Sequence, residues 1–197
     1  MMTALVPPPV ARRAPAWLLA AALASVLTPV GAERADRTKP MEVTADKSGN
    51  ADYQNQVLRF SGNVVITQGT MVIRADRVEL RETPDGYRSG TAWGTAGQPV
   101  RYRQKRDGSE EHLEGSAERI EFDGRSETLR LIGAAAVRRV RGGETVDEIT
   151  GALITWNQNA ELFSVQGGAP SADNPGGRVR AVLSPRASAA SAPKEPR

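Results

Sequence analysis

The chain has 197 residues and no cysteine, so an exported form would be stabilised by burial and strand pairing rather than by disulfides. Its basic excess lies near the two ends, because residues 40–168 hold 16 basic and 19 acidic side chains, a net charge of −3. A nucleic-acid surface needs clustered, uncompensated Lys and Arg, so this balance argues against nucleic acid as a partner.

The first 32 residues have the pattern of a secretory signal peptide. Arg12 and Arg13 precede an apolar run over residues 17–27, and the segment ends in Val30-Gly31-Ala32. A transmembrane anchor is the alternative, but the run is shorter than the roughly 20 residues that span a bilayer. We therefore expect Sec export to the periplasm of a Gram-negative bacterium, cleavage after Ala32, and a flexible lead-in over residues 33–39.

Residues 60–80 alternate in polarity as a β-hairpin does. Gln68-Gly69-Thr70 can form the turn, and on both sides of it apolar side chains recur at every second position: Phe60, Val64, Ile66, Met71, Ile73 and Ala75. The apolar parity then changes, because Val78 and Leu80 are even-numbered. A β-bulge near Asp76 would absorb this change.

Similar segments return further along the chain. Residues 58–62, 129–133 and 163–167 each alternate and close on a glycine, so each is predicted to be a strand that ends there. A second pattern, in which a small residue precedes two apolar ones, occurs over residues 75–80, 117–122 and 151–156. Such repetition is typical of stacked units that cannot bury their apolar faces alone.

The other predicted elements are also strands and turns. Residues 41–45 begin the alternation, and residues 82–86 form a Pro- and Gly-containing turn. Further strands are expected over residues 100–104, 128–140, 149–156, 162–165 and 178–183, with Gly142-Gly143 as a hairpin tip, and residues 113–122 carry a further copy of the repeat. Together they predict one domain over residues 40–185, followed by a low-complexity, disordered tail over residues 186–197.

The residues that enzymes need are scarce. His112 is the only histidine, and no nucleophile elbow, phosphate-binding loop or paired-histidine motif occurs. Glu118 and Glu121 could pair for glycoside hydrolysis, but alternating charges on a solvated strand face explain them better. We therefore predict a non-enzymatic protein without cofactor or metal.

A binding function is better supported by the pattern. An antiparallel sheet that turns one apolar face inward must fold over on itself as a sandwich, jelly roll or incompletely closed barrel. The residues expected to face inward are Met41, Val43, Phe60, Val64, Ile66, Met71, Ile73, Tyr102, Ile120, Phe122, Leu131 and Trp156. They line either a slot open at both ends or a dry core, and the pattern leaves both open.

Basic residues lie near the predicted strand ends. Arg101, Arg103, Arg138, Arg139 and Arg141 could lie at the rim of such a slot and meet anionic head groups. Solvated surface arginine is the alternative.

The hairpin carries a resemblance to a known family. Gly62-Asn63-Val64, then Gln68-Gly69-Thr70 and Ala75-Asp76, followed by Trp93-Gly94 and Gln98-Pro99, resemble the OstA-like family of LptA-type periplasmic lipopolysaccharide-transport proteins. The resemblance covers about residues 40–185. It departs at Gly133-Ala134-Ala135, where the family has Gly-Asn-Val or Gly-Asn-Ala, and in the loop at residues 83–90.

This resemblance implies a twisted, open β-jelly roll that binds lipopolysaccharide and carries it from the inner to the outer membrane, with the lipid A acyl chains in an apolar groove. It implies head-to-tail stacking with further copies, with an inner-membrane LptC-type jelly roll and with an outer-membrane LptD-type N-terminal domain. The family's lipid-contact positions fall on Met41, Val43, Tyr102 and Phe122. With the inward-facing pattern, the predicted lipid-binding set is Met41, Val43, Phe60, Ile66, Ile73, Tyr102, Phe122 and Leu131. A structural or scaffolding β-domain without a lipid channel is the alternative.

Overall fold

The computed structural model describes Asp36 and residues 38–86, 88–95, 97–106, 108–160, 162–169 and 176–185. The predicted signal peptide over residues 1–32 and the predicted tail over residues 186–197 lie outside these described residues. Within the described residues, no helix has the length and apolar character needed to cross a bilayer.

The described residues form an all-β fold, as predicted. The strands are β1 (Glu42–Thr44), β2 (Ser48–Asp52), β3 (Val57–Gln68), β4 (Met71–Glu82), β5 (Arg88–Trp93), β6 (Val100–Lys105), β7 (Glu111–Ala117), β8 (Arg119–Asp123), β9 (Thr128–Arg141), β10 (Glu144–Asn157), β11 (Leu162–Gln166) and β12 (Arg180–Leu183). The predicted hairpin tips are confirmed, since β3 meets β4 around Gly69 and β9 meets β10 around Gly142 and Gly143. Residues 113–122, where the repeat pattern recurs, fall in two strands, β7 and β8.

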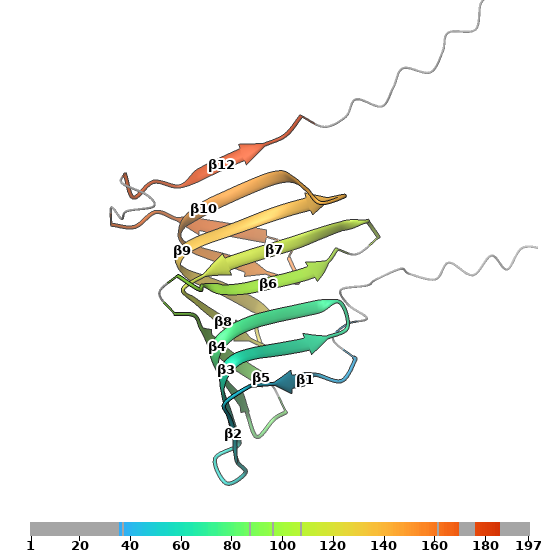
Figure 1. Cartoon of the computed structure of the whole chain (residues 1–197). Helices are drawn as coiled ribbons and strands as arrows, with labels where there is room; N and C mark the ends of the chain where they lie inside the picture. The colour runs from blue at the N-terminus through green and yellow to red at the C-terminus, as the bar shows by residue number, and fades with distance from the viewer. Residues whose placement is uncertain are drawn as a thin grey trace, which may run out of the picture.

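One antiparallel sheet folds over to make two layers (Figure 1). The four long strands β3, β4, β9 and β10 belong to both layers, because each pairs with different neighbours along its two halves. The first layer runs β1–β3–β4–β6–β7–β9–β10–β12, and the second runs β2–β3–β4–β5–β8–β9–β10–β11. This arrangement is the open jelly roll that the sequence predicts.

The bends between the layers lie at two glycines in long strands. In β3, Gly62 and Asn63 have φ angles of 83° and 45°, and in β9, Gly133 and Ala134 have φ angles of 79° and 41°. Two β3 residues thus lie opposite the single β4 residue Asp76, so the predicted β-bulge is confirmed.

The prediction that these strands end at their glycines is wrong. A left-handed pair inside a strand redirects the strand without ending it, so β3 and β9 continue into the other layer. Only the third copy of the pattern behaves as predicted, because β11 ends at Gln166, just before Gly167.

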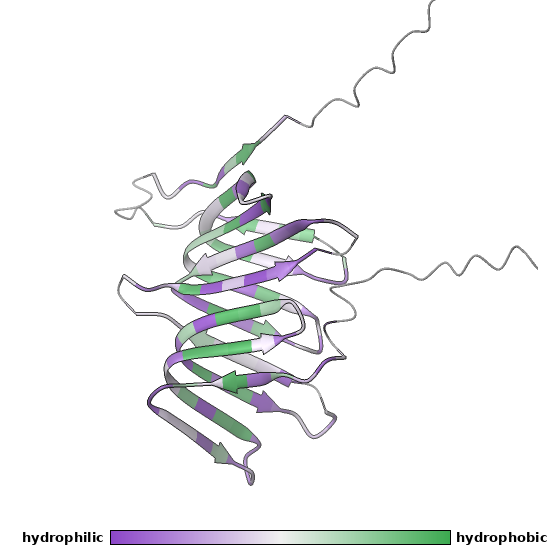
Figure 2. Cartoon of the chain, turned by 45° about the vertical axis from the view of Figure 1, so that its right-hand side comes forward, coloured by the Kyte–Doolittle hydropathy of each residue, from purple (hydrophilic) through white to green (hydrophobic). Residues whose placement is uncertain are grey.

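The apolar core lies between the layers. Along individual strands hydrophobic and hydrophilic residues alternate (Figure 2), which gives each layer one apolar face. The buried cluster includes Val64, Val100, Ala117, Leu131 and Ile154, all at most 1% exposed. The C-terminal edge is formed by β11 in the second layer and by β12 in the first, and every residue of β12 is exposed.

Candidate functional site

Four predicted lipid-contact residues form one row across the first layer. Strand pairing places Val43 of β1 opposite Ile66 of β3, Ile66 opposite Ile73 of β4, and Ile73 opposite Tyr102 of β6. Directly paired residues of neighbouring strands share a face, and Ile66 and Tyr102 are 3% and 2% exposed. The row therefore faces the interior between the two layers.

A cavity of about 330 Å³ lies against this row. Its first-layer wall contains Met41, Ile66, Met71, Ile73 and Tyr102. Its second-layer wall is contributed by β4, β5, β8 and β9: Val78, Leu80, Ala92, Ile120, Phe122 and Leu129. The cavity thus lies between two apolar walls that come from opposite layers.

A second cavity of about 430 Å³ lies at the β1–β2 end. Val43, Tyr53, Val57 and Leu58 line it, and Tyr53 is 87% exposed. Met41, Leu80 and Arg88 line both cavities, so the two are adjacent parts of one space. We call this space the groove; it reaches the surface at the N-terminal edge of the sheet.

At its other end the groove meets an aromatic cluster. Tyr102 lines the first cavity and packs edge-on against Trp156, with ring centroids 6.1 Å apart. Trp156 stacks on Phe163 of β11 at 5.4 Å. Neither cavity of the groove is lined by Leu131, Ile154 or Trp156, which are at most 5% exposed. The described interior is therefore open in its N-terminal half and packed beside Trp156.

The predicted residues therefore divide into two groups. Met41, Val43, Ile66, Ile73, Tyr102 and Phe122 line the groove. Leu131 instead belongs to the packed core at 1% exposure, and Phe60 lies over Gly49 of β2 outside both cavity walls. Neither cavity includes Trp156, so the expected slot open at both ends stays a prediction.

Several wall residues were absent from the predicted site. Leu80 is one, although the parity change after Ala75 already placed it on the inner face. Ala92 lies on β5, a strand that the sequence did not predict. Tyr53 lies in a polar turn, where alternation carries no information.

Asp36 also lines the first cavity, although the sequence placed it in a flexible lead-in. It is 2% exposed, and its carboxylate accepts hydrogen bonds from Thr70 Oγ1 at 2.5 Å, Gln104 Nε2 at 3.2 Å and Lys39 Nζ at 3.3 Å. Burial raises the pKa of Asp36, but these hydrogen bonds outweigh it and hold the pKa below its ordinary value. Gly69 makes the approach possible, since a Cβ there would overlap the Asp36 carboxylate.

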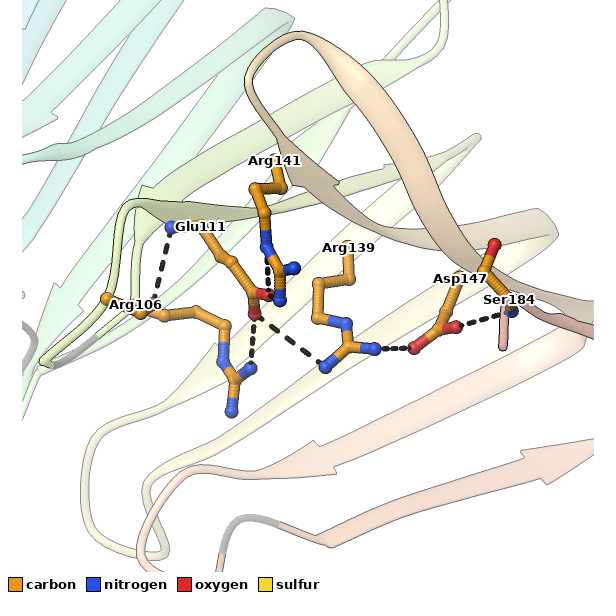
Figure 3. Close-up of polar contacts among 7 residues, drawn as sticks. Arg106, Glu111, Arg139, Arg141, Asp147 and Ser184 are labelled. Carbon is orange, nitrogen blue, oxygen red and sulfur yellow. Dashed lines mark hydrogen bonds and ion pairs between the residues drawn. The ribbon is translucent and has the colours of Figure 1, made fainter. Parts of the chain in front are cut away.

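A cluster of arginines surrounds Glu111 at the tips of the first layer (Figure 3). The Glu111 carboxylate, whose side chain is 6% exposed, pairs with Arg141, with Arg106 at 2.8 Å and with Arg139 at 3.7 Å. The hydrogen bond from Arg141 is the largest of the effects that hold the pKa of Glu111 below its ordinary value. Arg139 also pairs with Asp147, which accepts a hydrogen bond from the Ser184 backbone N–H at 3.1 Å.

The other predicted rim arginines lie on the opposite face of the first layer. Arg103 pairs with Glu114 at 3.6 Å and Arg138 with Glu148 at 2.6 Å, in register positions that alternate with the inward-facing Tyr102 and Val137. Arg101 is likewise exposed. Only Arg139 and Arg141 of the predicted five belong to the Glu111 cluster.

The residues considered for catalysis do not converge. Glu121 forms ion pairs with Arg119 and Arg130, and Glu118 lies beside the Gly133 bend. Across the part of the chain that the structure describes, no three His, Cys, Asp or Glu side chains are grouped to hold a metal ion.

Comparison with known proteins shows the family to which the chain belongs. Residues 42–162 match the sequence profile of the family described as LptA/(LptD N-terminal domain) LPS transport protein. The chain belongs to this family. Its match starts at β1 and ends in β11, so it contains both layers and the groove.

Individual LptA proteins are similar over most of their length. The chain is 29% identical over 150 residues to the lipopolysaccharide export system protein LptA of Escherichia coli strain K12, covering 76% of this chain and 78% of that protein. It is 27% identical to LptA of Haemophilus influenzae, covering 76% of this chain and 80% of that protein. The crystal structure of LptH, the LptA homologous periplasmic component of the lipopolysaccharide transport device from Pseudomonas aeruginosa, superimposes with a TM-score of 0.64 at 24% identity, covering 76% of this chain and 99% of LptH. This last likeness bears on the fold.

Proposed function

We propose that this LptA-family chain is a periplasmic lipopolysaccharide-binding bridge protein that carries lipopolysaccharide from the inner to the outer membrane. The observation that carries the proposal is the groove itself. Two apolar walls from opposite layers enclose a space that is open at one edge, in a chain of the LPS transport family. The role is that of a carrier without catalysis of its own.

The physical basis is the cost of exposing acyl chains to water. Each buried CH₂ contributes about 0.8 kcal/mol, so even a partly buried lipid A chain prefers an apolar wall to the periplasm. Met41, Val43, Ile66, Ile73, Tyr102 and Phe122 are the proposed lipid contacts, because they line the groove. Phe60 and Leu131 lie outside its walls and would meet lipid only if the interior opened further.

The proposed partners dock at the edges of the sheet. Unpaired strand edges accept further strands by backbone hydrogen bonding. β1 and β2 form the N-terminal edge, and β11 and β12 the C-terminal edge. We assign these edges to an LptC-type jelly roll of the inner membrane, an LptD-type N-terminal domain of the outer membrane and further copies of the chain, stacked head to tail.

The proposed location is the periplasm, because the similar protein LptH of Pseudomonas aeruginosa is a periplasmic component of its lipopolysaccharide transport device. Export would use the sequence pattern of residues 1–32, with cleavage after Ala32. Detection of a mature N-terminus at Glu33 by mass spectrometry of periplasmic protein would test this.

Photo-crosslinking in intact cells tests the lipid contacts directly. A photoreactive residue at Met41, Ile73 or Phe122 should crosslink to lipopolysaccharide, whereas one at the outward, exposed Thr44 should not. Absence of crosslinks from all three groove positions would refute the carrier function.

The packed interior beside Trp156 favours a second candidate, a scaffolding β-domain that joins envelope proteins without carrying lipid. The two functions differ in one measurement, the binding of lipopolysaccharide to the purified chain. A carrier would bind it and would lose that binding when Val43 and Ile73 carry charges. A scaffold would bind none and would join its partners normally with the same charges.

A further inference from the structure

The inner face of the first layer changes from apolar to polar in one step toward its hairpin tips. Strand pairing across β6, β7, β9 and β10 aligns an apolar row: Tyr102, Gly115, Val137 and Ile149. Two positions nearer the tips it aligns a second row: Gln104, Leu113, Arg139 and Asp147. Residues two apart on a strand share a face, so both rows face the interior.

The Glu111 cluster is the outermost part of this inner face. Glu111 is paired in register with Arg141 and lies two positions from Leu113, which is paired with Arg139. Its nearly buried carboxylate therefore holds Arg141, Arg139 and Arg106 together on the side that faces the interior (Figure 3).

The three guanidinium groups have more donors than these carboxylates can use. Each guanidinium carries five N–H donors and can bind a phosphate through two of them. Arg141 and Arg106 remain 60% and 41% exposed although both contact Glu111. The nearby carboxylate of Glu110 pairs with Lys105 and is 89% exposed, so it lies outside the cluster.

Gln104 connects this cluster to the groove. It lines the first cavity, and in register it is paired with Leu113, whose other neighbour is Arg139. A lipid whose acyl chains contact Tyr102 and Ile73 would have its head group beside Gln104. The arginines are the next side chains along the same face.

We infer that Arg106, Arg139 and Arg141, held in place by Glu111, bind a phosphate monoester on the head group of the lipid in the groove. The inference rests on the proposed function, because it assigns the polar end of the same ligand. A phosphate monoester carries about −1.5 to −2 charges near pH 7. It would therefore be drawn to arginines whose side chains are already fixed by a buried carboxylate.

The test compares two lipids on the chain purified from the periplasm. One is bis-phosphorylated lipid A, and the other is the same lipid A after both phosphates have been removed. The wild-type chain should bind the phosphorylated lipid about tenfold more tightly, the effect of one charge-assisted hydrogen-bonded contact. The R106Q/R141Q variant should bind both lipids equally.

The outer face of the second layer offers a matched control. There Arg119 and Arg130 pair with Glu121 at 3.1 and 3.0 Å, another arginine–glutamate–arginine group, and neither arginine lines the groove. The R119Q/R130Q variant should keep the full preference for the phosphorylated lipid. If R106Q/R141Q does not fold, R106K/R141K replaces it, because lysine keeps the charges but cannot bind phosphate through two parallel N–H groups. A reduced preference for the phosphorylated lipid in the lysine variant supports the inference, and an unchanged preference contradicts it.

Three results would overturn the inference in different ways. Equal binding of the two lipids by wild type would refute the phosphate site and leave the carrier function standing. No binding of either lipid would refute the carrier function as well. Saturable binding of inorganic phosphate alone, lost in R106Q/R141Q, would assign the cluster to free phosphate instead of a lipid head group.

Discussion

Tyr102 and Trp156 meet edge to face, with ring centroids 6.1 Å apart and ring planes at 73°, at the boundary between the open and the packed parts of the interior. Tyr102 belongs to β6 and Trp156 to the second half of β10, so the contact joins the two layers. This contact marks the end of the groove, because Tyr102 lines it and Trp156 does not. It also makes Trp156 a sensitive position for stability.

Replacing Trp156 by alanine should destabilise the fold by about 3–5 kcal/mol, because the change removes the contacts to both Tyr102 and Phe163 and leaves a cavity. Urea unfolding followed by far-ultraviolet circular dichroism measures this. W156F keeps part of the stacking and should lose less. A loss below about 1 kcal/mol for W156A would show that the interior repacks readily and that Trp156 does not fix the end of the groove.

A charge in the groove wall should weaken lipid binding. Val43→Asp and Phe122→Asp each place a carboxylate on an apolar wall while both residues remain partly exposed, so the fold should survive. We expect at least about a tenfold loss of affinity for lipopolysaccharide, measured by binding to the purified chain. Thr44→Asp, on the exposed outer face of β1, is the matched control. Wild-type affinity in both groove variants would argue against the groove as the binding site.

The bends in β3 and β9 should depend on glycine for two separable reasons. At Gly62 (φ 83°) an added Cβ would meet Lys47 Cγ at 2.5 Å, whereas at Gly86 (φ 81°) it would meet no atom within 4 Å. G86A therefore measures the cost of the left-handed backbone alone, about 1–2 kcal/mol. G62A should cost more, because Lys47 must also move. Equal losses in thermal unfolding of the two variants would show that the contact with Lys47 is relieved freely.

The Glu111 cluster should make stability depend on pH in the acid range. The pKa of Glu111 is lower in the folded chain than its ordinary value of 4.5. The ionised Glu111 therefore contributes to the free energy of unfolding above that pH, and this contribution is lost as the pH falls through the folded-state pKa. Wild type should therefore lose more stability than E111Q between pH 7 and pH 3, in urea midpoints measured across that range. E111Q should cost about 1–3 kcal/mol at pH 7, because it leaves three guanidinium groups without their shared carboxylate.

Glu110 provides the control for this measurement. It is adjacent in sequence and also ion-paired, but it is 89% exposed, so E110Q should behave as wild type. If E110Q and E111Q changed the loss of stability between pH 7 and pH 3 equally, burial of Glu111 would not be the cause of that loss.

The residue pattern was sufficient for the fold class, the two hairpin tips and the bulge opposite Asp76, and six of the eight residues predicted to bind lipid line the groove. Alternation along a strand determines which side chains share a face, and pairing rows such as Val43–Ile66–Ile73–Tyr102 follow once the hairpins are recognised. The family fingerprint lies in the same hairpin and its turn. These are local properties, encoded within one or two neighbouring strands.

The interior itself depended on contacts between distant parts of the chain. Leu131 and Ile73 have equivalent inward patterns, yet one is packed and the other lines a cavity, because the side chains from the opposite layer differ at each place. Asp36 reaches the cavity only because Thr70, Gln104 and Gly69 leave it a polar, uncrowded position. Three arginines meet Glu111 only where β6, β7 and β9 come together. Alternation specifies the side of a strand on which a residue lies, whereas packing across the fold determines what that residue touches.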